Sequence, residues 1–243
     1  TTGFEGTASR QDDLDIPSFG RIAGERANSS KNPEKIEGMK KARIILHPYA
    51  VEGILGSTFL PSIDGESVFR KNSPLCGKIR KKIFSENLTL TDEGLLKGGL
   101  NSFPFDDEGV PCQRTPIVSS GVLKNFLYNW ESAIRAKKKS TGNGFRGPSS
   151  VPHISPTNLV VSPGKEKKKA LLEGIENGFS VLWLSGTHTT NPYSGDFSVE
   201  MKNSFQVKNG KVGKPVKYGL ISGNVFDVLK GVKIARDGIE NAT

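Results

Sequence analysis

The sequence predicts an α+β fold, predominantly antiparallel β-sheet of sandwich or barrel-like form with several inserted helices. The 243 residues include 28 glycines and 14 prolines, so turns are frequent and the regular elements between them are short. Hydrophobic residues, 35% of the chain, occur in patterned, strand-sized runs. This length suffices to bury a core without disulfide or metal support. A helical bundle is excluded, and so is a membrane-spanning helix, which needs about 18 consecutive apolar residues.

The first quarter of the chain is predicted to form a helix, a loop, a strand and a second helix. Residues 12–30 place apolar side chains on one stripe, which indicates an amphipathic helix with Pro17 in its first turn, where a missing N–H costs nothing. After a polar loop, residues 43–47 are typical of a short buried strand, and residues 48–59 of a helix. This strand followed by a helix is the clearest α/β element of the sequence.

The middle of the chain changes from helical spacing to alternation. A hairpin turn is expected at Ser119-Ser120-Gly121, and Asn129 is the expected cap of the helix that follows the hairpin. The predicted elements are helical stretches at 66–69 and 76–84, strands at 87–91, 115–118 and 122–128, and a helix at 129–139.

The last part of the chain repeats this pattern after a loop at residues 141–156. Asn209-Gly210 is the strongest hairpin signal of the sequence, and Asn224 is expected to cap the final helix. The predicted elements are strands at 158–161, 178–184, 197–207 and 211–222, and helices at 165–177 and 224–233.

The net charge of +9 is the first functional indication, and it is ambiguous. Lysines cluster at residues 78–82, 137–139 and 165–169, but few aromatic residues lie among them, as a nucleic-acid surface would require. Solvated helix ends and loop tips are the favoured explanation of the clusters. Cys76 and Cys112 cannot form a disulfide framework and fit two free thiols, so a cytoplasmic protein is expected.

The sequence contains no complete catalytic motif. Residues 142–147 satisfy G-x-G-x-x-G but lack the flanking strand and helix that dinucleotide binding needs. The three histidines form no metal-binding pair, and no Gly-x-Ser-x-Gly marks a nucleophile. Residues 105–109 carry three carboxylates, which fit either a hard-cation site or a turn with an acidic rim.

Several sequence blocks, in order and over most of the chain, resemble the C-terminal domain of the TldD/PmbA family, known as modulator of DNA gyrase. The resemblance places the tail of the family's N-terminal half at residues 1–42 and the C-terminal domain at 43–243, so the chain is expected to be a piece of a longer protein. The blocks are 105–115, 121–128, 140–144, 157–158 with 163–164, 191–198, 209–210 with 214–216, and 221–224.

The resemblance implies a cytoplasmic zinc metalloprotease in which TldD and TldE (PmbA) subunits enclose a cavity and degrade unfolded peptides. In the TldD type, His-Glu-x-x-x-His on a helix after a strand supplies two zinc ligands, and a Cys near the C-terminus completes the site. Here Pro48, Tyr49 and Gly53 stand at the His, Glu and His positions, His47 is one residue early, and the chain stops before the Cys position. The sequence therefore resembles the metal-free TldE/PmbA type.

This type implies no metal or catalytic residue in the chain, with zinc held by a TldD-like partner. The partner is either such a subunit or a second copy of the chain, and unfolded peptides are the expected substrates. No membrane partner is expected. A nucleic-acid or gyrase-associated binding module and a stand-alone hydrolase are the alternatives. Motif positions indicate the cavity-lining candidates, which are His188, Asn191, Tyr193, Asp196, Thr141, Asn143 and Arg146.

Overall fold

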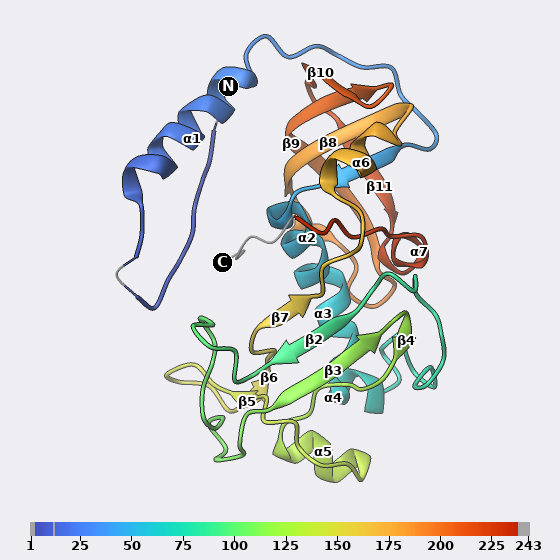
Figure 1. Ribbon diagram of the computed structural model, residues 1–243. Coiled ribbons are helices and arrows are strands. Elements are labelled where there is room, and N and C mark those ends of the chain that lie inside the picture. The colour runs from blue at the N-terminus through green and yellow to red at the C-terminus, as the bar shows by residue number, and fades with distance from the viewer. Residues whose placement is uncertain (1–2, 12, 238–243) are drawn as a thin grey trace.

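The computed structural model describes residues 3–11 and 13–237, which form two β-sheets joined by helices (Figure 1). The larger sheet has the strand order β1-β8-β9, with both β10 and β11 paired to β9. The β1–β8 pair is parallel and the other pairs are antiparallel. Its strands are β1 (Arg43–Leu46), β8 (Asn177–Ser185), β9 (Asp196–Lys208), β10 (Lys211–Pro215) and β11 (Leu220–Asn224).

The smaller sheet has the order β4-β3-β2-β7 and is antiparallel, and a separate two-stranded hairpin lies beyond it. The turn between β3 and β4 uses Ser120 and Gly121, both with positive φ, as a tight two-residue hairpin requires. The strands are β2 (Leu90–Glu93), β3 (Arg114–Ser119), β4 (Val122–Leu123) and β7 (Leu159–Val161), and the hairpin is β5 (Gly144–Phe145) with β6 (His153–Ile154).

One hydrophobic core connects both sheets. Helix α2 (Pro48–Ile54) passes into a π-helical turn, η1 (Leu55–Phe59), in which Phe59 and Leu55 are buried in the core. Phe59 packs edge-on against Phe84, with ring centroids 5.9 Å apart. The helices are α1 (Ile16–Ser29), α2 (Pro48–Ile54), α3 (Leu60–Ser62), α4 (Gly65–Phe69), α5 (Trp130–Ala136), α6 (Lys168–Glu173) and α7 (Val225–Lys230), with a 3₁₀ turn η2 (Thr187–Thr189).

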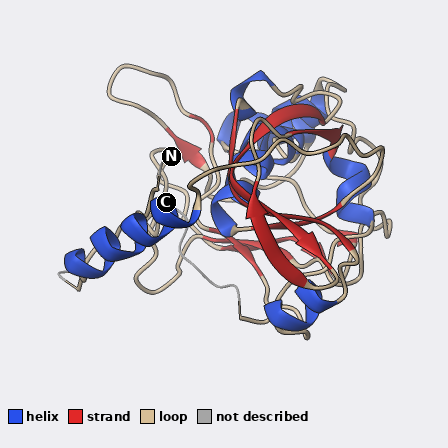
Figure 2. Cartoon of the chain, turned by 90° about the horizontal axis from the view of Figure 1, so that it is seen from above, coloured by secondary structure: helices blue, strands red, loops and turns tan. Residues whose placement is uncertain are grey.

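α1 projects from the two sheets, as both views show (Figures 1 and 2). It has no buried residue and is accompanied by the extended segment 3–11. Asp15 caps the helix by accepting a hydrogen bond from the Ser18 N–H, and Asn203 on β9 donates to the Ser30 hydroxyl at its other end. Arg26 within the helix also forms an ion pair with Glu5 of the extended segment, so polar contacts, rather than burial of the apolar stripe, position the helix.

The predicted α+β class with mainly antiparallel sheet is confirmed, at about 24% helix and 27% strand. No sheet closes into a barrel within the described residues. The helix predicted at 76–84 is wrong, because Gly77 and Arg80 adopt positive φ and the Arg80 N–H instead donates to the Leu123 carbonyl. The helix expected at 165–177 is shorter, and the strand expected at 122–128 ends at Leu123.

The described helices include none that is long and apolar enough to cross a lipid bilayer. The longest of them, α1, has 14 residues and carries polar and charged side chains among its apolar ones.

We predict that Gly178→Ala destabilises the protein by roughly 1–3 kcal/mol, because an alanine β-carbon would lie 2.0 Å from the Arg43 carbonyl oxygen across the β1–β8 pair. Gly174→Ala is the matched control, since its nearest neighbouring atom would be 3.5 Å away. Urea unfolding measures both. Equal midpoints for the two variants would contradict the close approach of β1 and β8.

Candidate functional site

The start of α2 is the first candidate site, because the residues that the sequence resemblance aligns with a zinc motif lie there. β1 pairs with β8, the His47 N–H donates to the Val181 carbonyl, and Pro48 opens α2 at a position where no N–H is required. A β-carbon at Gly53 would lie 3.2 Å from the Thr187 methyl, so a larger side chain there requires Thr187 to shift. The helix is therefore held at its start by β8, through the bond to Val181, and near its end by the residues around Thr187.

Tyr49 is covered by the extended N-terminal segment. Its ring contacts Phe4 edge-on, with centroids 5.7 Å apart, and Arg26 lies over the same ring at 6.0 Å. Its hydroxyl is within hydrogen-bond distance of the Glu5 carboxylate, at 2.5 Å, and the Gly6 N–H donates to it at 3.3 Å. Glu5 also forms an ion pair with Arg26 at 2.5 Å. Tyr49 thus joins α2 to segment 3–6 and to α1.

The electrostatics of this cluster favour a neutral phenol. Burial, followed by the hydrogen bond with Glu5, raises the pKa of Tyr49 above its ordinary value. The Tyr49 hydroxyl therefore acts as a hydrogen-bonding group and not as a phenolate base or ligand at neutral pH.

These residues do not fit zinc. A catalytic zinc site needs three nitrogen, sulfur or carboxylate ligands with one open position. The side chains of Pro48 and Gly53 have no donor atom, and the Tyr49 hydroxyl is engaged by segment 3–6. Within residues 3–11 and 13–237, no group of three or more His, Cys, Asp or Glu side chains could hold a metal ion.

The second candidate site is the β8–β9 connection, which lies against α2 and η1. His188 is exposed on η2, and Tyr193 is 63% exposed. Asn191 and Asp196 instead hold the turn together. The Asn191 carboxamide oxygen accepts the Tyr193 and Ser194 N–H groups, and the Asp196 carboxylate accepts bonds from Ser194 and Asn224. These last two bonds lower the pKa of Asp196.

The third candidate site is the loop that leads into β5. Asn143 is fully buried, accepts a hydrogen bond from the Thr141 hydroxyl, and donates to the Asp92 carboxylate at 2.7 Å and to the Ser155 carbonyl at 3.0 Å. The other oxygen of Asp92 accepts from the N–H and hydroxyl of Thr157. Asp92 is 1% exposed, and burial raises its pKa although these hydrogen bonds oppose the shift.

The acidic segment 105–109 forms a turn that holds the same loop. Asp106 is buried, and its two carboxylate oxygens accept backbone N–H groups of Glu108 and Gly144. The Arg146 N–H donates to the Asp107 carboxylate at 2.8 Å, while the Arg146 side chain is exposed. Backbone donors therefore occupy these carboxylates, which supports the turn interpretation of the acidic cluster over a cation site.

The structure brings Thr141 and Asn143 into one network and Asn191 and Asp196 into another, and among the described residues no hydrogen bond or ion pair joins the two. Sequence reasoning missed Asp92 and Glu5. An aspartate directly after an alternating apolar run is a signal that could have identified Asp92. No signal in the sequence pairs Glu5 with Tyr49.

We predict that Asp92→Ala lowers the free energy of unfolding by about 3 kcal/mol, because the buried donors of Asn143 and Thr157 lose their acceptor. Asp107→Ala is the control, since this exposed carboxylate accepts one surface N–H, from Arg146, and its loss should cost no more than about 0.5 kcal/mol. Chemical denaturation of both variants tests this difference. A similar loss in both would show that Asp92 is not the centre of the network.

We predict that Cys112 resists alkylation in the folded protein at pH 8. Burial, with smaller contributions from Asp106 and Asp92, raises the pKa of its thiol to about 11, so the thiolate fraction at pH 8 is on the order of one in a thousand. Iodoacetamide labelling followed by peptide mass spectrometry should show Cys112 modified only after denaturation. Rapid labelling of Cys112 in the native chain would contradict its burial.

The comparisons with known proteins agree with the sequence blocks. The family described as PmbA/TldA metallopeptidase C-terminal domain matches residues 39–241. A protein of Methanocaldococcus jannaschii, MJ0231, is 40% identical over 222 residues, covering 91% of this chain and 52% of the relative. A metalloprotease PmbA homolog of Haemophilus influenzae is 31% identical, covering 98% of this chain and 51% of the relative.

The crystal structure of TldE from Thermococcus kodakarensis superposes with a TM-score of 0.85 at 29% identity, covering 97% of this chain and 55% of that one. The chain thus spans about half the length of the relatives it matches. The match over residues 39–241, together with the agreement in fold, identifies the chain as a member of the PmbA/TldA metallopeptidase family, within its C-terminal domain.

Proposed function

We propose that this chain is the C-terminal domain of a metal-free, TldE/PmbA-like subunit of a cytoplasmic zinc metalloprotease complex that acts on unfolded peptides. The observation that carries the proposal is the start of α2. There Pro48, Tyr49 and Gly53 supply no zinc-ligand set, and Tyr49 is bound by Glu5 and Gly6. The structural similarity to TldE supports the same assignment. In this proposal zinc belongs to a TldD-like partner.

In this proposal the subunit contributes part of the wall of the peptide cavity and no catalytic residue. The turn at residues 187–193 lies against α2 and η1, because a β-carbon at Gly53 would lie 3.2 Å from the Thr187 methyl and the Thr190 hydroxyl reaches the Ser57 carbonyl. We therefore assign the exposed His188 and Tyr193 to the wall of the peptide cavity. Asn191 and Asp196 would hold the turn that presents them.

We assign Thr141 and Asn143 to holding the loop at residues 141–146 in place rather than to peptide contact. Asn143 is fully buried, and Thr141 is bonded to it. Among these candidates, the exposed Arg146 side chain is the one that could reach a peptide. Its guanidinium would favour peptide carboxylates.

A nucleic-acid module receives less support. The lysines at 137–139 follow α5 at one end of the molecule, and those at 165–169 surround the start of α6 by the other sheet (Figure 1). Phosphate contacts require cations along one continuous track. Filter binding across a salt series tests this alternative, which predicts retention that falls steeply as salt rises.

We predict that the purified chain holds substoichiometric zinc and does not cleave casein alone. With a subunit that carries His-Glu-x-x-x-His, cleavage should appear and be abolished by a zinc chelator. Metal analysis and a casein assay of each subunit and of the mixture test this, with the TldD-like subunit as the positive control for zinc. Stoichiometric zinc and partner-free cleavage by this chain would overturn the proposal.

A further inference from the structure

One end of the molecule exposes large apolar side chains on two neighbouring helices. Phe69 at the end of α4 is 51% exposed, and Trp130 and Ile134, one turn apart on α5, are 58% and 63% exposed. Residues four apart lie on the same side of a helix. We call this surface, with the adjoining lysines 71 and 137–139, the α4–α5 face. An exposed tryptophan one helical turn from an exposed isoleucine is typical of a protein interface.

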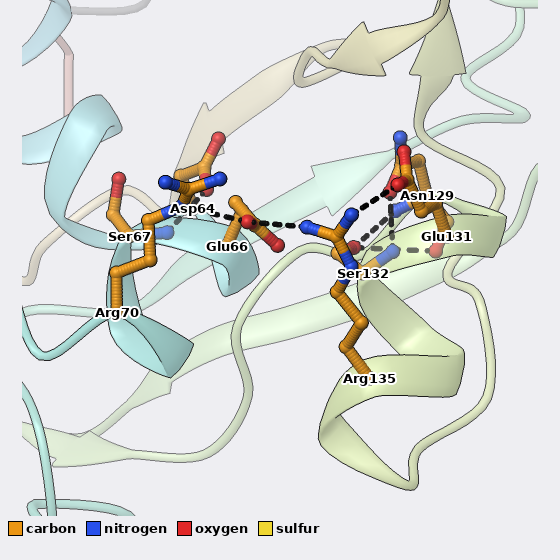
Figure 3. A network of polar contacts seen from close by, with 8 residues as sticks. All are labelled: Asp64, Glu66, Ser67, Arg70, Asn129, Glu131, Ser132 and Arg135. Carbon is orange, nitrogen blue, oxygen red and sulfur yellow. Dashed lines mark hydrogen bonds and ion pairs between the residues drawn. The ribbon is translucent and has the colours of Figure 1, made fainter.

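The α4–α5 face is held rigidly. Asn129 and Ser132 form a reciprocal capping box at the start of α5, and the Glu108 carboxylate accepts the Trp130 N–H at 2.6 Å. Arg135 then ties α5 to α4 through its ion pair with Glu66 at 2.8 Å (Figure 3). A side chain presented by a preordered helix loses less entropy on binding than one on a loop.

The α4–α5 face is also basic, because the ion pairs that hold it neutralise its carboxylates and leave its lysines without an ion pair to any described residue. Figure 3 shows Arg135 between Glu66 and Glu131, with Arg70 on the other side of Glu66, so these two carboxylates are already paired. Asp64 caps α4 by accepting the Ser67 N–H. Among the ion pairs of the described residues, none involves the lysines at 71 or 137–139. The face therefore presents uncompensated positive charge around its apolar residues.

A groove continues the basic edge. Lys138 and Lys139 line a shallow depression of about 410 Å³ together with Arg114 and Thr115 of β3. Phe126 and Tyr128, both buried, also line this depression. A protein segment that covers Trp130 and Ile134 can thus extend past the lysines into a concave surface.

We propose that the α4–α5 face docks an acidic, apolar-centred surface of the TldD-type partner subunit, and that it does so in preference to a second copy of this chain. A twofold self-contact through this face would bring its lysines toward the same lysines of the copy, and like charges facing each other disfavour association. An acidic partner gains both the apolar contact and the charge pairing. The inference rests on the proposed function, because it takes the partner from it.

The test measures binding of the full chain to the TldD-type subunit of the same organism by isothermal titration calorimetry. Trp130→Ala/Ile134→Ser and Lys138→Glu/Lys139→Glu should each weaken binding by about tenfold or more. The matched controls are Leu220→Ala, 71% exposed on the other sheet, and Lys168→Glu/Lys169→Glu on α6, which should bind as the unmodified chain does. Circular dichroism and thermal melting confirm that each variant is folded.

The outcomes separate the two proposals. If the unmodified chain binds and both face variants bind equally well, the inference is overturned and the proposed function stands. If the unmodified chain does not bind the subunit, both fail. If the chain self-associates in light scattering and Trp130→Ala/Ile134→Ser abolishes this, the face joins copies of this chain and the acidic partner is wrong.

Discussion

The parallel pairing of β1 with β8 is the constraint on which the rest of the structure depends. It is the one parallel pair among the named strands of the described chain, and it joins residues more than a hundred positions apart. The pair closes only because Gly178 leaves room for the Arg43 carbonyl. From the end of β1 the chain turns directly into α2, whose Ala50 and Ile54 are buried, so this pairing sets where Tyr49 and Gly53 lie.

A second level of order comes from buried carboxylates that organise glycine-rich backbone. Gly142 has φ +71, and a β-carbon there would lie 2.5 Å from the Pro111 carbonyl, so a side chain is excluded for two independent reasons. Glycine has no side chain to pack, and Asp92 and Asp106 hold this loop instead through hydrogen bonds to Asn143 and Gly144. The glycines thus allow the backbone path of this loop, and the two carboxylates hold the loop in place.

Local sequence signals predicted local structure well. The Asn129 and Asn224 caps and the Asn209-Gly210 turn all form where expected, because each depends on a few neighbouring residues. The failures involve distant contacts. The segment 76–84 has helical spacing, yet Arg80 is bonded to Leu123. No local rule pairs β1 with β8 either, since parallel register is decided by packing across the whole chain.

The candidate site shows the same division. Sequence could identify which donors α2 lacks, because that depends on the identities at three positions. It could not show that Glu5, Gly6 and Arg26 enclose Tyr49, which depends on the path of the chain between α1 and α2.

This geometry explains how α2 can lack a zinc ligand set and still be folded. Small domains that fold around a structural metal lose their fold without it, because the metal supplies the folding free energy. Here α2 is held by the burial of Ala50 and Ile54 and by the hydrogen bond from His47 to Val181, none of which involves the metal-motif positions. The outer side of the helix is then available for contacts such as those of Tyr49. In this fold, the buried positions that hold α2 against the core are therefore different from the positions aligned with the metal motif.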